Sequence, residues 1–135
     1  EDIPQVLAEC RRVLKNGGRF LCSTYGKQHM REITDLVQQF HKEIVLSAEV
    51  LYERFGLENG ENLLAPYFPE IQMRRYEDAI EIAEAEPLIS YILSCHGNQN
   101  QLLLNQYKEF REFVSARVAD GFHITKDAGI FLCRK

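Results

Sequence analysis

The sequence predicts an α/β fold, and three observations indicate it. An amphipathic helix opens the chain, a short apolar run follows it after a glycine pair, and a second amphipathic helix comes next. Apolar residues that recur at i, i+3, i+4 and i+7 mark each helix, whereas a short, bounded apolar run is typical of a buried strand. The order helix, turn, strand, helix indicates helices packed on a sheet.

The opening helix is expected to run from an N-cap at Asp2 to Lys15. An aspartate accepts hydrogen bonds from the first N–H groups of a helix, and Pro4 is tolerated in the first turn. Lys15 suits the negative end of the helix dipole, and residues 16–18 form the turn that ends the helix. Its apolar face consists of Ile3, Val6, Leu7, Cys10, Val13 and Leu14.

Arg19 to Tyr25 is the first predicted strand, and Gly26 ends it. Its centre, residues 20–22, is apolar without interruption, which predicts a strand covered on both faces. The helix after Gly26 has its apolar side chains on one face. They are Met30, Ile33, Leu36, Val37 and Phe40.

The middle of the chain is predicted as broken helix and then a strand. Ser47 suits the N-cap of a short helix, and glycines at 56 and 60 interrupt the helical pattern after it. The apolar side chains of these short helices are Val50, Leu51, Phe55, Leu63, Leu64, Tyr67 and Phe68. Alternating side chains from Ile71 to Tyr76 predict a strand.

Two further helices and two short strands are expected after it. The helices run from Glu84 to Cys95 and from Asn100 to Ala119, where apolar residues recur at helical spacing. Residues 122–124 and 129–133 are then predicted as a strand pair around a turn at Lys126 and Asp127.

Composition and charge exclude several classes of protein. The chain has 135 residues, of which 45% are hydrophobic and 27% charged, as expected of one globular domain over residues 1–135. Its net charge is -4 and its cations are scattered, so it lacks the basic face that binds nucleic acid. No apolar run approaches the ~20 residues that a membrane-spanning helix needs. Because the cysteines and histidines are dispersed along the sequence, we expect no metal site. We expect the cysteines to be free thiols in a cytoplasmic protein.

Residues 6–20 read VLAECRRVLKNGGRF. This stretch resembles a hallmark of class I, Rossmann-like S-adenosylmethionine-dependent methyltransferases, in which a helix reading L-x-E-x-x-R-V-L-K-P-G-G leads into the fifth strand of the sheet. Asn16 stands where the family has proline, and asparagine also suits the turn. The stretch from Asp127 to Lys135 looks like the family's last strand. The resemblance therefore implies the C-terminal part of such a sheet, strands five to seven, with the last strand antiparallel.

The same resemblance implies how the rest of the chain is used. Residues 45–68 and 78–119 would be helical lid insertions over a small-molecule methyl acceptor, and residues 122–134 the closing strand pair. The family binds its cofactor on a glycine-rich loop after its first strand, and the only Gly-Gly pair here follows a helix. We therefore expect S-adenosylmethionine to bind the full-length parent through residues upstream of Glu1, and no cofactor to bind this chain alone.

Site residues are expected beyond the C-terminal end of the first predicted strand, where such sheets bind ligands. Thr24 and Tyr25 offer hydroxyl groups there, together with Ser23, and His29 offers an imidazole, a common general base. A second interpretation stays open. In it Ser23 and Thr24 only cap the next helix, and His29 is an exposed residue near its start.

The predicted lid supplies three more candidates for substrate binding. The rings of Tyr52 and Tyr91 would wall a pocket, and Arg54 would hold a carboxylate or phosphate. Aromatic residues at helical spacing also suit an ordinary core, so that interpretation stays open. No catalytic residue is assigned, because methyl transfer chiefly needs an aligned nucleophile and a dry site.

The predicted function is methyl transfer to a small molecule by the parent protein, with this chain inactive alone. Two alternatives remain: a non-catalytic lid or dimerisation module, and an unrelated α+β domain. Because the fourth strand of the family's sheet would be missing, Arg19 to Tyr25 would form an unprotected sheet edge. We expect the chain to self-associate through that edge.

Overall fold

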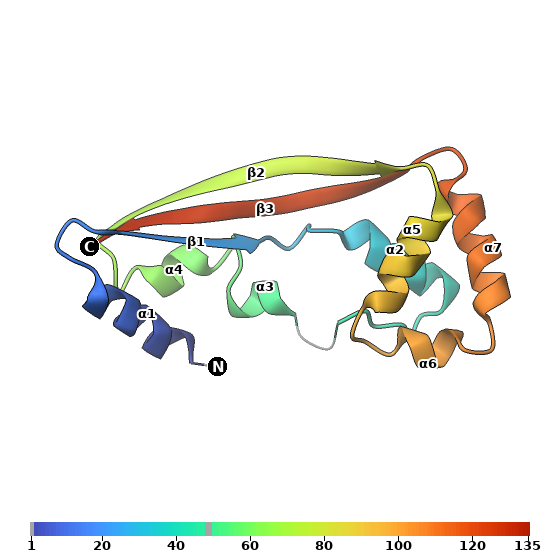
Figure 1. Cartoon of the computed structure of the whole chain (residues 1–135), viewed down its shortest axis with the longest axis horizontal. Helices are drawn as coiled ribbons and strands as arrows, with labels where there is room; N and C mark the ends of the chain where they lie inside the picture. The colour runs from blue at the N-terminus through green and yellow to red at the C-terminus, as the bar shows by residue number, and fades with distance from the viewer. Residues whose placement is uncertain (1, 48–49) are drawn as a thin grey trace. The chain divides into compact units, whose positions relative to one another are not determined.

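The computed structural model describes residues 2–47 and 50–135. Within them the chain is mixed α/β, with helices and a three-stranded antiparallel sheet of order β1-β3-β2 (Figure 1). In chain order the elements are α1 (Ile3–Val13), β1 (Arg19–Tyr25), α2 (Arg31–Phe40), α3 (Leu51–Arg54), α4 (Gly60–Leu64), β2 (Glu70–Ile82), α5 (Ala85–Ser94), α6 (Gln99–Leu103), α7 (Tyr107–Val118) and β3 (Phe122–Arg134). The α/β prediction is confirmed at this level.

The structure divides into two compact units, each with its own core. The first unit comprises Glu1–His29, Leu51–Glu77 and Asp127–Lys135, and the second comprises Met30–Val50 and Asp78–Lys126. Strands β2 and β3 contribute residues to both units. The pocket described below belongs entirely to the first unit.

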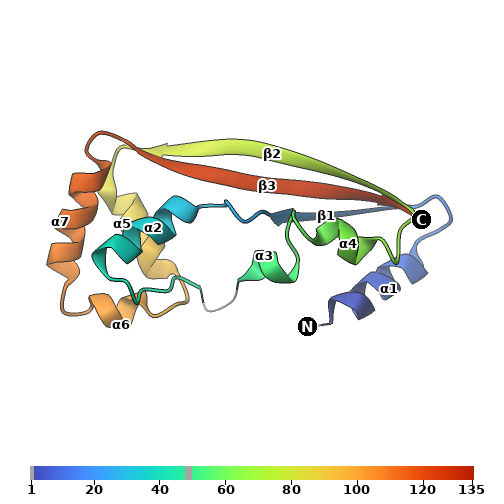
Figure 2. The same ribbon diagram turned by 180° about the vertical axis from the view of Figure 1, so that it is seen from behind.

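In the first unit, α1, α3 and α4 lie on one side of the strands (Figure 1, Figure 2). The core beneath them holds Leu7 of α1, Leu64 of α4 and Phe131 of β3, and the rings of Phe20 and Phe68 stack with centroids 5.3 Å apart. α4 approaches the sheet closely, because a Cβ on Gly60 would lie 2.5 Å from the Phe131 ring. Burial of these apolar groups positions β1 and its C-terminal end.

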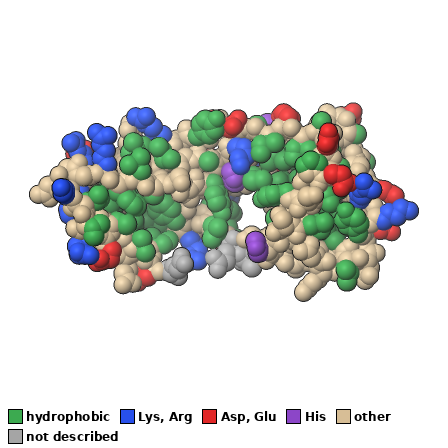
Figure 3. Space-filling model, viewed as in Figure 1, with side chains coloured by type: hydrophobic (Ala, Val, Ile, Leu, Met, Phe, Trp, Pro, Cys, Tyr) green, Lys and Arg blue, Asp and Glu red, His purple; other side chains and the backbone are tan. Residues whose placement is uncertain are grey.

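The other face of β1 is open, so the predicted cover on both faces is wrong. Leu21 is 57% exposed and Ile130 of the neighbouring strand is 37% exposed. Successive side chains of a strand point to opposite faces. In β1, Phe20 and Cys22 pack against the helices, whereas Leu21 between them faces away. An uninterrupted apolar run therefore contributes to a sheet covered on one face only, and apolar side chains reach the molecular surface (Figure 3).

The second unit is a helical cluster built on α2, α5 and α7. Its core includes Val37, Ile92 and Phe110, all fully buried, and Phe40 meets Phe110 edge to face. The chain enters α2 through Met30, which has a positive φ of 56°. The apolar faces that the sequence predicts for α2 and α5 are therefore buried in this core.

The predicted long helix over residues 100–119 is two helices. α6 ends at Leu103 and α7 begins at Tyr107, and Leu104 between them is 77% exposed. Leu103 and Phe110 are both buried in the same core, so the apolar spacing continues across the break. A periodic pattern alone does not reveal such an interruption.

The predicted turn at Lys126 and Asp127 is also wrong. β3 runs unbroken from Phe122 to Arg134, so residues 122–134 form one strand and not a strand pair. β2 extends to Ile82, which places residues 78–82 in a strand rather than in a helical insertion. No helix in the described part of the chain combines the length and apolar character needed to cross a membrane.

Candidate functional site

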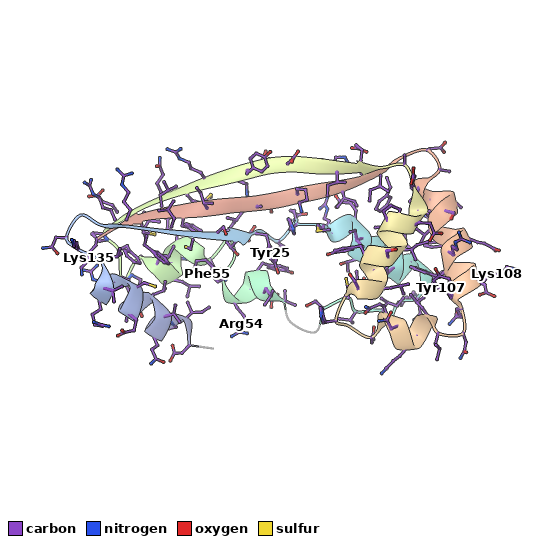
Figure 4. The ribbon with its side chains drawn as sticks, in the orientation of Figure 1. Tyr25, Arg54, Phe55, Tyr107, Lys108 and Lys135 are labelled. Atoms are coloured by element: carbon purple, nitrogen blue, oxygen red, sulfur yellow. The ribbon has the colours of Figure 1, made fainter. Side chains whose placement is uncertain are left out.

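A pocket of about 580 Å³ lies at the C-terminal end of β1. This volume is within the range of small-molecule sites. Its walls come from α1, β1 and the turn after it, α3 and the residue after it, β2 and β3. Figure 4 labels three of the lining residues, Tyr25, Arg54 and Phe55. The lining residues are Ile3, Ser23, Thr24, Tyr25, His29, Leu51, Arg54, Phe55, Tyr76, Ala128, Gly129 and Ile130.

The structure brings four of the six predicted site residues together. Thr24, Tyr25, His29 and Arg54 all line this pocket. Tyr52 belongs to α3 but does not line the pocket, and its carbonyl oxygen accepts a hydrogen bond from the Asn59 amide at 3.3 Å. The pocket thus joins the end of β1 and the turn after it to Leu51, Arg54 and Phe55 of the predicted lid.

Tyr91 belongs to the second unit. It lies on α5, and its hydroxyl donates to the Met30 sulfur at 3.8 Å. It is not among the residues that line the pocket.

Tyr25 and His29 form the aromatic centre of the pocket. Their rings stack, with centroids 5.0 Å apart and planes 23° apart. Burial raises the pKa of the Tyr25 hydroxyl, which therefore stays protonated at neutral pH. A protonated phenol donates a hydrogen bond, and the stacked pair offers a flat aromatic surface.

Thr24 ties the end of β1 to the segment after α3. Its hydroxyl donates to the Phe55 carbonyl at 2.6 Å, and the Leu57 N–H donates to the Tyr25 carbonyl at 3.4 Å. The interpretation of Thr24 as a helix cap is wrong, because α2 has Met30 at its N-cap position and no side-chain cap. Thr24 instead holds one wall of the pocket in place.

The turn after β1 is held by two carboxylates, Asp127 and Glu58, which the sequence analysis did not assign to a site. The Gln28 N–H donates to Asp127 at 3.3 Å, and the Lys27 N–H donates to Glu58 at 3.1 Å. Arg75 bridges both acids, with Arg75 Nε 2.9 Å from Asp127 and Arg75 Nη2 3.1 Å from Glu58. This network fixes the rim of the pocket.

Two signals connect this network to the sequence. Asp127 precedes Gly129, Phe131 and Cys133 at intervals of two residues, so a continuous strand puts it on the face that meets the helices. Gly26 ends β1 where a Cβ would overlap Asp127 Oδ2. A glycine is therefore required where the turn approaches the buried carboxylate.

The described residues offer no metal centre. No group of three or more histidine, cysteine, aspartate or glutamate side chains gathers among them. Of the acidic side chains near α5, Glu81 pairs with His123, and Glu86 lies 2.5 Å from Arg111.

The Gly17-Gly18 turn does not fit a cofactor loop. The Gly17 N–H donates to the Lys135 carbonyl at 3.0 Å, and the Gly18 N–H donates to the Lys15 carbonyl at 2.8 Å. Both N–H groups are therefore used within the fold and are not directed at a ligand.

Comparison of the chain with models of known protein families found no match, and comparison with curated proteins found none. The ligand of the pocket is therefore inferred from the side chains that line it.

The chemistry of the pocket suits a flat small molecule. Four of its described lining residues carry aromatic rings: Tyr25, His29, Phe55 and Tyr76. No carboxylate side chain is among the described lining residues, whereas Arg54 carries a guanidinium. An aromatic ring with a carboxylate or phosphate substituent matches both properties.

Proposed function

We propose that this chain is the C-terminal part of a class I, Rossmann-like S-adenosylmethionine-dependent methyltransferase, and that its pocket receives the small-molecule methyl acceptor. The observation that carries the proposal is the position of the pocket, at the C-terminal end of β1 and lined by Thr24, Tyr25 and His29. That is where α/β sheets of this type place their ligands.

Two features of the first unit support the resemblance to that family. α1 ends at Val13, a turn with Gly17 at a φ of 73° comes next, and β1 begins at Arg19, which matches the helix, glycine turn and strand of the family motif. The last strand, β3, is antiparallel to β1, as the resemblance implies for the closing strand.

The cofactor itself is not assigned to this chain. The N–H groups of the Gly17-Gly18 pair are bonded within the fold, so this turn does not serve as the family's glycine-rich loop. On this proposal the glycine-rich loop lies upstream of Glu1 in the parent protein, and the present residues bind and orient the acceptor alone. Free thiols at all four cysteines agree with a cytoplasmic parent.

The lining residues then have distinct roles. The stacked rings of Tyr25 and His29 hold a flat acceptor, and the guanidinium of Arg54 binds its carboxylate or phosphate. The protonated Tyr25 hydroxyl donates a hydrogen bond to the acceptor. The His29 imidazole takes the proton that a hydroxyl or amine acceptor releases.

A transfer assay with the longer parent protein that this proposal implies tests this function. Methyl label would be followed from S-adenosylmethionine to a panel of aromatic acids, with the variants Tyr25→Leu, Arg54→Gln and Tyr52→Leu. Loss of a charged hydrogen bond should lower kcat/KM about tenfold or more for Arg54→Gln. Tyr52→Leu is the matched control outside the pocket and should change kcat/KM little. Equal effects of all three variants, or no transfer to any acid, would contradict the proposal.

A second candidate is a non-catalytic assembly module. One observation favours it: β1 lies at the edge of the sheet, with β3 as its one neighbour in the described structure.

A further inference from the structure

Three residues of the pocket form a row across the sheet: Tyr25 of β1, Ala128 of β3 and Tyr76 of β2. Tyr25 lies directly opposite Ala128 in the register of β1 with β3. On the other side of β3, a Cβ on Gly129 would lie 3.3 Å from the Cα atom of Arg75, so Gly129 faces Arg75. Because β2 and β3 are antiparallel neighbours, one residue back along β3 meets one residue forward along β2, which places Ala128 opposite Tyr76.

An ion pair farther along the two strands agrees with this register. The register places Glu70 opposite Arg134, and Arg134 Nη1 lies 3.8 Å from Glu70 Oε2. Side chains of directly opposed residues stand on the same face of a sheet, so the whole row shares one face. It is the open face of β1, because Tyr25 lies on the side of the strand that Leu21 occupies.

The row forms a slot with two aromatic walls. The methyl group of Ala128 is its floor, and the side chains of Tyr25 and Tyr76 stand on either side. Ile130, the next residue of β3 on this face, also lines the pocket and limits the slot along the strand. The Tyr25 ring is held by stacking on His29, with 5.0 Å between ring centroids, and Tyr76 is 67% exposed, so its ring surface is available to a ligand.

The width of the slot follows from the spacing of the strands. The Gly26 N–H donates to the Asp127 carbonyl at 2.9 Å, so the next pair, Tyr25 with Ala128, is not hydrogen-bonded and Ala128 directs its backbone groups to β2. The Cα atoms of the two tyrosines are therefore about 10 Å apart. An aromatic ring that stands midway, on Ala128, has its centroid about 5 Å from each tyrosine ring, inside the range of roughly 4.5–7 Å for aromatic pairs.

On the basis of the proposed function, we propose that the methyl acceptor stands in this slot as a planar aromatic ring between Tyr25 and Tyr76, and that Ala128 selects for that shape. A saturated ring is puckered and has no π face, so it fits the slot less well and gains no stacking from the two walls. A side chain larger than alanine at position 128 fills the floor and excludes the ring.

NMR titrations of the 135-residue chain with 2-naphthoate and with its saturated counterpart, decahydro-2-naphthoate, test the proposal. Both probes carry the carboxylate that Arg54 is proposed to bind, and only the first is planar. The wild type should bind 2-naphthoate about tenfold more tightly than the saturated probe, because the planar probe makes two aromatic contacts.

Matched variants assign this preference to the slot. Tyr76→Leu removes one wall and should weaken the binding of 2-naphthoate about fivefold, whereas Tyr76→Phe keeps the ring and should bind as the wild type does. Ala128→Val enlarges the floor and should weaken 2-naphthoate about tenfold or more. Ala79→Val makes the same change at an exposed position of β2 outside the pocket and should leave binding unchanged.

Far-ultraviolet circular dichroism verifies that each variant is folded, and the Tyr76 variants decide the question if Ala128→Val does not fold. Four results would overturn the proposal: no binding of 2-naphthoate at the highest concentration reached, equal affinities for the two probes, equal losses from Tyr76→Leu and Tyr76→Phe, or equal effects of Ala128→Val and Ala79→Val.

The slot and the proposed function fail separately. Binding of 2-naphthoate that depends on Ala128 and Tyr76, combined with no methyl transfer by the longer parent protein, would contradict the proposed function and leave the slot as a binding site for planar rings. Methyl transfer that is unchanged in Tyr76→Leu and Ala128→Val would contradict the slot alone.

Discussion

Asp127 and Arg75 form an ion pair, with 2.9 Å between Arg75 Nε and Asp127 Oδ1, and the Asp127 side chain is only 7% exposed. The same carboxylate accepts the Gln28 N–H from the turn after β1. A buried charge of this kind is stable only with its partners in place. The rim of the pocket therefore depends on a contact between β2 and β3.

Removing this carboxylate should destabilise the first unit. We expect Asp127→Ala to lower the free energy of unfolding by about 2 kcal/mol, because it leaves the Gln28 N–H without its acceptor and Arg75 with Glu58 alone. Urea unfolding monitored by circular dichroism measures the change. Glu58→Ala is the comparison, because Glu58 is 44% exposed and should contribute about 1 kcal/mol or less. Equal losses for the two variants would contradict the assigned role of Asp127.

Gly26→Ala should be destabilising for a steric reason. The added Cβ would overlap Asp127 Oδ2 and lie 2.8 Å from Glu58 Oε1, so the turn or both carboxylates must move. We expect a loss of about 2 kcal/mol, typical of overpacking. Gly121→Ala provides a control, because a Cβ there meets nothing within 4 Å and only its φ of 93° opposes the change. A Gly26→Ala protein as stable as the wild type would show that the turn is not held as described.

The stability of the second unit should depend on pH through Glu32. Partial burial raises the pKa of Glu32, but the hydrogen bonds that its carboxylate accepts from Thr125 and from its own backbone N–H, together with the charge of Arg31, outweigh this, and the pKa lies below its ordinary value. A lowered pKa means that the unfolded chain binds the proton more readily. The stabilisation is therefore complete above the unfolded pKa of about 4.3 and is lost as the pH falls through the lower folded value.

Glu32→Gln measures this contribution. The difference in unfolding free energy between wild type and variant should be largest near neutral pH and should shrink below about pH 4. Thr125→Val removes the hydroxyl donor and should move the pKa of Glu32 upward, which is visible by NMR titration. A difference that stays constant from pH 7 to pH 3 would disprove the linkage.

The thiol of Cys22 should be unreactive in the folded chain. Burial raises its pKa to about 11, with a further contribution from the neighbouring Cys133 and Cys10. The thiolate is the form that reacts, so alkylation by iodoacetamide at pH 8 should be on the order of a hundredfold slower than in urea. Trypsin separates Cys22 from Cys10, because Arg11 and Arg19 lie between them, and mass spectrometry reads each peptide. Equal rates in buffer and urea would contradict the burial of Cys22.

Elements set by local signals could be predicted from the sequence. Asp2 accepts the Gln5 N–H at 3.0 Å as the N-cap of α1, and β1 has the predicted bounds Arg19–Tyr25. The position of the residues after β1 predicts a ligand site, and Thr24, Tyr25 and His29 do share one pocket. Local sequence carries this information because the cap, the strand and the turn lie within a few residues of one another.

The predictions that failed depend on residues far apart in the chain. The acidic character of Asp127 predicts a turn, yet Asp127 is buried in the sheet, where it pairs with Arg75 and accepts the N–H of Gln28, which lies 99 positions away. The aromatic ring of Tyr91 suggests a wall of the pocket, but Tyr91 lies in the second unit. No pattern of spacing reveals such partners, because tertiary contacts decide which charged or aromatic side chains are brought together.

Calorimetric titration of S-adenosylhomocysteine tests the central proposal most directly, using the 135-residue chain and the longer parent protein that the proposal implies. The methyltransferase proposal predicts binding by the longer product only, since the cofactor loop is expected upstream of Glu1. Binding by neither protein would contradict the proposed function, and binding by the 135-residue chain would contradict the upstream position of the cofactor site.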